Sequence, residues 1–191
     1  MITDAQIHLW EIDRPERPWP KPLRGIPQRE GGFPAEQALA EMDAAGVDRV
    51  VIVPAVVAGD RNEYALDVVA KYPERFAIMG RIDIDDPASE GMLATWKMQP
   101  NMLGIRLSGG TGWKQVADGT LEWLWAGCER FGIPIMMLPE PAVLPAVAEV
   151  AERHPALTLV LTTSRSTSSR TGRRGTPSTR RSRWRGSLGS T

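Results

Sequence analysis

Several common features are scarce or absent in this chain of 191 residues, and each absence excludes a class of protein. The chain has one cysteine, Cys128, so no disulfide can form within it, and a catalytic thiol would need a base that the sequence does not place nearby. We expect Cys128 to be a small core residue. No apolar run approaches the roughly 18 residues of a membrane helix, and the N-terminus lacks the pattern of a signal peptide. These absences favour a cytoplasmic protein that does not enter a membrane.

All of the acidic residues lie in the first 161 residues of the chain. Residues 162–191 contain eight Arg, eight Ser and seven Thr but no Lys, Asp or Glu, whereas residues 1–161 hold 23 acidic and 15 basic residues and only two serines. The net charge of zero therefore conceals a body of −8 and a segment of +8. Such a segment has too little apolar surface to offset the entropy cost of ordering. We predict a folded body at 1–161 and a disordered basic tail at 162–191.

The body alternates β-rich and amphipathic helical runs. Repeated strand–helix–strand units imply a parallel α/β sheet. The loop after the first strand lacks a Gly-rich phosphate turn, which disfavours dinucleotide binding, and the Pro-rich insert at 14–34 is typical of a loop over the mouth of a barrel. We expect an incomplete (β/α)8 TIM barrel of about six βα units. The predicted strands are 2–9, 49–53, 76–82, 102–107, 133–138 and 157–161, and the predicted helices are 35–45, 62–71, 89–98, 121–131 and 142–154.

Four segments of the body follow one another at the spacing of barrel strands and loops. They read Asp4-Ala5-Gln6-Ile7-His8-Leu9-Trp10, Gly59-Asp60-Arg61-Asn62, Arg75-Phe76-Ala77-Ile78-Met79-Gly80-Arg81 and Gly104-Ile105-Arg106-Leu107. Together they resemble the amidohydrolase-related family of TIM-barrel hydrolases, which includes lactonases and decarboxylases acting on small carboxylated or sugar-derived substrates. The resemblance implies a hydrolase that adds water to a lactone or similar ester bond in a small carboxylated substrate.

The resemblance also bears on the cofactor. In the metal-dependent members the first strand carries His-x-His, because alternate strand residues share one face and two imidazoles then converge on one ion. Here Gln6 and His8 occupy those positions, and the predicted strand at 133–138 has no histidine. An amide oxygen is a poor zinc ligand. The resemblance therefore implies a metal-independent member, with a weakly held divalent ion on His8 as the alternative.

The candidate site residues lie at the carboxyl ends of predicted strands and in the mouth loops, where TIM barrels build active sites. His8 is the candidate catalytic residue that polarises a substrate carbonyl or holds a residual metal, with core packing as the alternative. Arg106, the second catalytic candidate, suits bidentate capture of a carboxylate, with an ion pair as the alternative. The candidate substrate-binding residues are Gln6, Trp19 and Asp83, whose structural alternatives are barrel filling, packing and a salt bridge with Arg81.

Two further tryptophans and the second histidine are assigned by their neighbours in the sequence. Trp113 falls in a predicted mouth loop, where it could wall a pocket. Trp125 lies on a predicted helix and is expected to pack in the core. His154 stands in a polar helix terminus, where a cation favours the helix dipole, and we expect it to be solvated and without function.

The sixth predicted strand leads directly into the basic segment. Family members commonly continue such a strand with Asp-His, whereas this chain reads Thr162-Thr163-Ser164. One additional G ahead of GC-rich codons for this stretch restores Asp-His, so we hypothesise a one-nucleotide frameshift after Leu161 that truncates the barrel and impairs catalysis. The alternatives are a non-catalytic remnant and a protein whose tail binds nucleic acid nonspecifically through phosphates. An open sheet also exposes a strand edge, which favours self-association.

Overall fold

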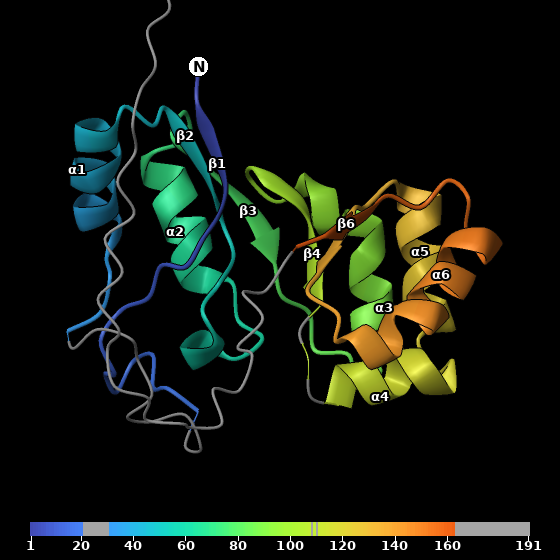
Figure 1. Ribbon diagram of the computed structural model, residues 1–191. Coiled ribbons are helices and arrows are strands. Elements are labelled where there is room, and N and C mark those ends of the chain that lie inside the picture. Colours follow the sequence, from blue (N-terminus) through green and yellow to red (C-terminus); the bar gives the residue numbers. More distant parts are fainter. Residues whose placement is uncertain (21–30, 108, 110, 163–191) are drawn as a thin grey trace, which may run out of the picture.

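A single parallel sheet forms the centre of the computed structural model, which describes residues 1–20, 31–107, 109 and 111–162 (Figure 1). Its strands pair strictly in chain order, which is the order of strands in a TIM barrel. The sheet is therefore an incomplete TIM barrel, as the sequence predicted. The strands are β1 (Thr3–Ile7), β2 (Arg49–Ile52), β3 (Phe76–Gly80), β4 (Met102–Leu107), β5 (Ile135–Met137) and β6 (Leu159–Leu161).

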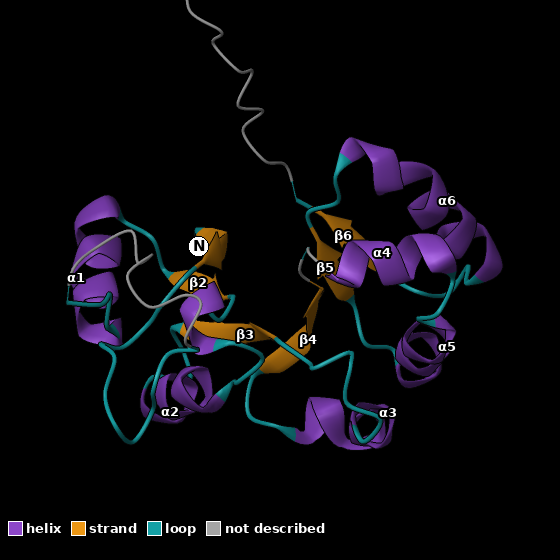
Figure 2. Cartoon of the chain, turned by 90° about the horizontal axis from the view of Figure 1, so that it is seen from below, coloured by secondary structure: helices purple, strands orange, loops and turns teal. Residues whose placement is uncertain are grey.

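The sheet curls into an arc, and helices lie along its convex side (Figure 2). The first and last strands of the arc, β1 and β6, form its two edges. The α-helices are α1 (Ala35–Ala45), α2 (Glu63–Lys71), α3 (Ser89–Met92), α4 (Thr111–Asp118), α5 (Glu122–Phe131) and α6 (Leu144–Arg153), and the 3-10 helices are η2 (Val56–Ala58), η3 (Leu93–Met98) and η4 (Pro141–Val143). Among the described residues, no helix has the length and apolarity needed to cross a bilayer.

Glycines end two of the helices that face the sheet. Gly46 follows α1 with φ of 70°, and Gly132 follows α5 with φ of 60°. This left-handed conformation is strained for residues with a Cβ, and it lets each glycine N–H bond to carbonyls of the last helical turn. The chain then turns back toward the sheet. As a result, β2 begins within a few residues of the end of α1, and β5 begins within a few residues of the end of α5.

The two faces of the sheet carry different side chains. The convex face contributes Ile52, Ile78, Ile105 and Ile135, all fully buried within the main apolar core that also contains helix residues. Because side chains alternate along a strand, Arg106 points to the opposite, concave face between its neighbours Ile105 and Leu107. The concave face therefore combines a small apolar cluster with polar side chains. That cluster consists of Val53, Met79 and Met136, with Val51 packed against it.

The fold corrects two expectations about aromatic and basic residues. Trp113 does not lie in a mouth loop: it belongs to α4 and is buried in the main core. His154 is not solvated, because its side chain is 7% exposed and lies between the carboxylates of Glu122 and Glu129. Cys128 and Trp125 are buried in the core, as predicted.

Two predicted segments fall largely outside the described residues. Residues 21–30 of the Pro-rich insert are not described, although Trp10 and Phe33 on either side form an isolated antiparallel bridge. The predicted disordered tail and the proposed change of reading frame concern residues 162–191, of which the structure describes Thr162.

Candidate active site

The carboxyl ends of the strands form a cavity of about 510 Å³ whose lining combines apolar and charged side chains. Arg81 follows β3 and Arg106 belongs to β4, and both are buried, with 6% and 8% of their surface exposed. The cavity also has carboxylates, on side chains that are exposed rather than buried. The site thus has a basic interior and an acidic rim, and the three rim residues are Asp60, Asp83 and Asp85.

Arg106 contacts both edge strands of the sheet. Its Nη1 donates a hydrogen bond to Gln6 Oε1, at 3.3 Å, and another to Thr162 Oγ1, at 3.1 Å. Burial lowers the pKa of Arg106, and the neighbouring charge of Arg81 lowers it further. A guanidinium nevertheless stays protonated in proteins. The sequence candidates Gln6 and Arg106 are therefore brought together, along with a residue that was not predicted, Thr162.

The second strand fixes the tautomer of His8. Nδ1 of His8 lies 2.9 Å from the backbone oxygen of Val53. Because a carbonyl oxygen can only accept, Nδ1 must carry the proton, and in the neutral ring Nε2 then has a free lone pair. Burial lowers the pKa of His8, and the charges of Arg81 and Arg106 lower it further, whereas the bond to Val53 raises it. The ring is thus neutral at pH 7 and can accept a proton at Nε2.

Arg81 is held by the loop that precedes α2. Its Nε donates to the backbone oxygen of Pro54 at 2.7 Å. The side chain of Asn62 also bonds both backbone groups of Arg81: Oδ1 accepts from the Arg81 N–H at 2.7 Å, and Nδ2 donates to the Arg81 oxygen at 2.8 Å. These three bonds fasten the end of β3 to the end of β2. Asn62 is a site-building residue that sequence reasoning had not assigned, whereas Arg81 had been considered only as the salt-bridge partner of Asp83; both lie in segments that carry the family resemblance.

The acidic rim brings one predicted residue to the cavity. Asp83 lines the same cavity as Arg81, and its Oδ1 accepts a hydrogen bond from the backbone N–H of Asp85 at 2.9 Å. Asp60, which was not predicted, also lies there. Although the residue is exposed as a whole, loss of water around its carboxyl group raises the pKa of Asp60, and the charges of Asp83 and Asp85 raise it further, whereas Arg81 lowers it.

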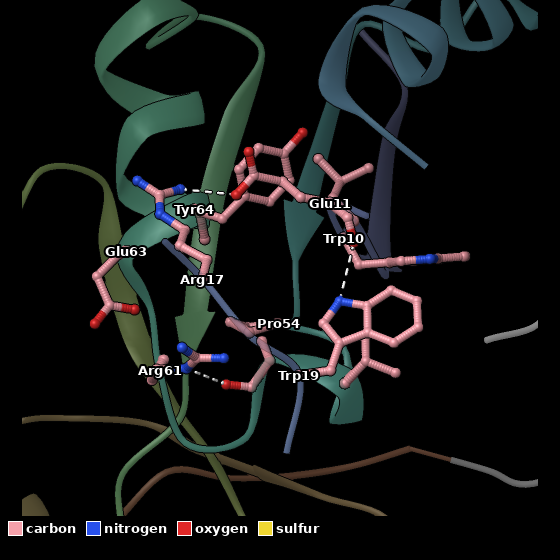
Figure 3. A pocket seen from close by; sticks show the side chains of 12 residues that line it. Trp10, Glu11, Arg17, Trp19, Pro54, Arg61, Glu63 and Tyr64 are labelled. Atoms are coloured by element: carbon pink, nitrogen blue, oxygen red, sulfur yellow. Dashed lines mark hydrogen bonds and ion pairs between the residues drawn. The ribbon is translucent and has the colours of Figure 1, made fainter. Parts of the chain in front are cut away.

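Trp19 lies at a different place from the other candidates. It lines a separate small pocket of about 40 Å³ next to Trp10, and its Nε1 donates to the Glu11 backbone oxygen at 3.1 Å (Figure 3). An ion pair between Arg17 and Glu11, at 2.9 Å, closes one side of this pocket. A volume of this size holds a water molecule or two rather than an organic substrate. Trp19 and Arg106 line different cavities.

The donor atoms near His8 do not fit a divalent cation. Oε1 of Gln6 already accepts a hydrogen bond from the cationic Arg106, and the positive charges of Arg81 and Arg106 disfavour a second cation beside His8. Within the part of the chain that the structure describes, no three His, Cys, Asp or Glu side chains are grouped as a metal site would require. The side chains of Gln6, His8, Arg81 and Arg106 are therefore the groups considered for chemistry at this site.

The fold and the polar cluster at the strand ends together define a protein of the TIM-barrel type with its candidate site at the usual end of the sheet. A family model described as Amidohydrolase matches residues 3–162. The chain therefore belongs to the amidohydrolase family.

Similar proteins give the family context. An L-fucono-1,5-lactonase from Burkholderia ambifaria is 27% identical over 161 residues, which cover 83% of this chain and 54% of the lactonase. A zinc-bound amidohydrolase from Burkholderia multivorans has a TM-score of 0.64 and 20% identity, over 84% of this chain and 57% of its own. A probable 2-pyrone-4,6-dicarboxylic acid hydrolase from Acinetobacter baumannii has a TM-score of 0.63 and 13% identity, over 84% of this chain and 57% of its own. The chain thus spans little more than half the length of these relatives.

Proposed function

We propose that the chain carries the hydrolytic site of an enzyme that opens a lactone or similar ester bond in a small carboxylated substrate. The observation that carries this proposal is the pairing of a neutral imidazole, with Nε2 free to accept a proton, with two buried guanidinium groups at the same end of the sheet. Ester hydrolysis needs a base for water and a positive charge for the developing oxyanion. The lactonase and pyrone hydrolase among its relatives support the same reaction class.

The reaction follows from the roles that these groups can take. Nε2 of His8 accepts a proton from a water molecule, and the water oxygen attacks the carbonyl carbon of the lactone. The carbonyl oxygen becomes an oxyanion, which Arg106 and Arg81 stabilise. When the tetrahedral intermediate collapses, the ring C–O bond breaks and the leaving oxygen takes the proton from His8. The product is a hydroxy acid, whose new carboxyl group releases its proton to solvent, and the resulting carboxylate remains opposite the arginines.

The chain spans little more than half the length of the lactonase and of the pyrone hydrolase, and its described part holds a six-stranded sheet. Impaired turnover by this chain is part of the proposal and stays a prediction. Neighbours of the same fold include a manganese-bound 5-carboxyvanillate decarboxylase from Novosphingobium aromaticivorans. The donor atoms around His8 favour hydrolysis without a metal over a reaction of that kind.

A panel of lactones and esters tests the proposal directly. We expect slow hydrolysis of at least one small lactone, measured by proton release, with no dependence on added zinc or chelator. The variant His8→Gln removes the proton acceptor and should lower kcat by about 100-fold, because general-base catalysis is typically worth that much or more. Gln37→Ala, on the outer surface of α1, is the matched control and should leave turnover unchanged. A folded chain that hydrolyses none of the panel would exclude the proposal in favour of a non-catalytic remnant.

A further inference from the structure

The Nη1 amino group of Arg106 is shared between the two edges of the open sheet. One of its bonds goes to Gln6 on β1, and the other goes to Thr162, which directly follows β6. An Nη group of a guanidinium carries two protons. Both protons of Nη1 are therefore committed to protein acceptors. This leaves the Nε and Nη2 groups of Arg106, three N–H donors in one plane.

These remaining donors belong to a side chain that lines the site. Among the described residues, the hydrogen bonds of Arg106 are the two made by Nη1. The residue itself is 92% buried, yet it lines the cavity of about 510 Å³ together with Arg81. Nε and Nη2 of a guanidinium form a fork that matches two oxygens of one planar group. The pair of Nη1 and Nη2 cannot bind two oxygens of a ligand in this way, because both protons of Nη1 are already bonded to protein acceptors.

Thr162 is itself fixed on both of its polar groups. Its backbone N–H donates to the Met137 oxygen at 2.8 Å, which continues the pairing of β5 with β6, and its Oγ1 donates to the same oxygen at 3.2 Å. The hydroxyl proton is thus used, and the lone pairs of Oγ1 remain for Arg106. The position of this acceptor is set by the sheet rather than by a flexible loop, so it can define the direction of the guanidinium.

Gln6 completes the arrangement from the opposite edge. Since Arg106 can only donate, the oxygen of the Gln6 amide must be the atom that faces it. An acceptor from each edge strand fixes the rotation of the guanidinium about its own axis, which a single acceptor would leave free.

We propose that Gln6 and Thr162 are positioning residues that hold Arg106 by Nη1 and so present its Nε and Nη2 fork to a planar group with two oxygens. A carboxylate has this geometry, and the O–C=O group of an ester shares it. This inference rests on the proposed function, because it assigns the orientation of substrate at the same site. It differs from a purely structural role in one respect. Losing either acceptor should weaken the binding of a planar anion more than the binding of a tetrahedral anion of the same charge.

Two small anions of equal charge separate these effects. Propionate is planar at its carboxylate, whereas methanesulfonate presents three oxygens in a tetrahedral arrangement. We would titrate each into the full chain and follow it by NMR, using the Arg106 Nε–H signal, or the backbone amide signal of Asp83 in the Arg106→Lys variant, to obtain two dissociation constants and their ratio. The variants are Thr162→Val, which is isosteric but has no hydroxyl, Thr162→Ser, which keeps it, and Gln6→Met, with Arg106→Lys as a variant that keeps the charge without the fork.

In the unmodified chain we expect propionate to bind about fivefold more tightly than methanesulfonate, the advantage of a bidentate fit. Thr162→Val and Gln6→Met should bring the ratio close to one, as Arg106→Lys should, while Thr162→Ser restores it. Melting temperatures of all variants are measured alongside, so that unfolding is recognised. The inference is overturned if Thr162→Val keeps the preference, or if neither anion shifts the Arg106 signal. Lactone hydrolysis is assayed separately. The proposed function and this inference can therefore be rejected independently of each other.

Discussion

At the scale of single residues, the chemistry of His8 is set by a neighbour that is distant in the sequence. The Val53 oxygen places the proton on Nδ1, and burial lowers the pKa of the ring. A His with a pKa lower in the folded than in the unfolded chain binds fewer protons when folded. Its contribution to stability is therefore present above the unfolded pKa and is lost as the pH falls below it.

This sign gives a direct prediction for a titration. We expect the imidazole C–H signal of His8 to move at a pH clearly below 6.5, the value of an unperturbed histidine. Proton NMR from pH 8 to pH 4.5 measures it, and His8→Gln identifies the signal because the chain has two histidines. The acid side of the rate profile should follow the same ionisation. A midpoint above neutral pH would mean that His8 is mostly charged at pH 7, and the base assigned above would be wrong.

Sequence reasoning reached some site residues and missed others for identifiable reasons. Gln6, His8 and Arg106 were predicted because they alternate along strands or end them, and strand ends meet in a barrel mouth. Thr162 and Asn62 were missed because their roles consist of hydrogen bonds to residues 56 and 19 positions away. No local pattern encodes such bonds. Whether the predicted residues act in catalysis stays a prediction.

At the scale of elements, His154 links the last helix to the one before it. Nδ1 of its buried ring lies 2.9 Å from Glu129 Oε2, and Nε2 lies 2.9 Å from Glu122 Oε1. Glu129 also accepts the backbone N–H of Ala156 through its other oxygen, and its pKa is lowered, mainly by the hydrogen bond to His154. These bonds anchor the segment that leads from α6 into β6 onto α5.

Removing this link should loosen the edge of the sheet. We expect His154→Leu to lower the melting temperature by about 5 °C, because it removes the buried ring that hydrogen-bonds both carboxylates. Arg153→Ala is the matched control: it breaks an exposed ion pair with Glu122 at 3.4 Å, and pairs of that kind contribute little. Circular dichroism melts at pH 7 measure both. Equal melting temperatures for His154→Leu and the unmodified chain would contradict this account of the α5–α6 contact.

The elements differ in how well the sequence predicts them. The ranges of α1 and β4 coincide with the predicted ones, since a glycine ends the helix and an apolar run defines the strand. The other strands are shorter than predicted, because the apolar runs extend past the paired positions at one end or at both ends. Helix α4 was missed because Gly109 and Gly112 indicate a loop, whereas its burial of Trp113 and Val116 favours a helix. Tertiary contacts outweighed local propensity there.

At the scale of the whole molecule, the sheet has two edges where a complete barrel has none. Its strand order runs from β1 to β6, and no pairing between these two strands is present in the described residues. Apolar side chains accompany both edges: Ile2 is 59% exposed, Val160 is 36% exposed and Leu161 is 53% exposed. Unpaired edges of this kind are templates for pairing with another chain. Arg106 links the two edges through the side chains of Gln6 and Thr162 rather than through backbone pairing.

We therefore expect the chain to self-associate through these edges. Sedimentation velocity between micromolar and hundred-micromolar concentrations should show a mass that rises with concentration. Val160→Lys places a charge on an edge strand at a residue outside the buried apolar clusters, and it should shift the association to higher concentration. Met98→Lys, at a site 80% exposed on η3 and away from both edge strands, is the matched control and should leave association unchanged, so that added charge alone is not the cause. If both variants shift association equally, general solubility accounts for the effect, and if the unmodified chain stays monomeric throughout, the open edges do not pair in solution.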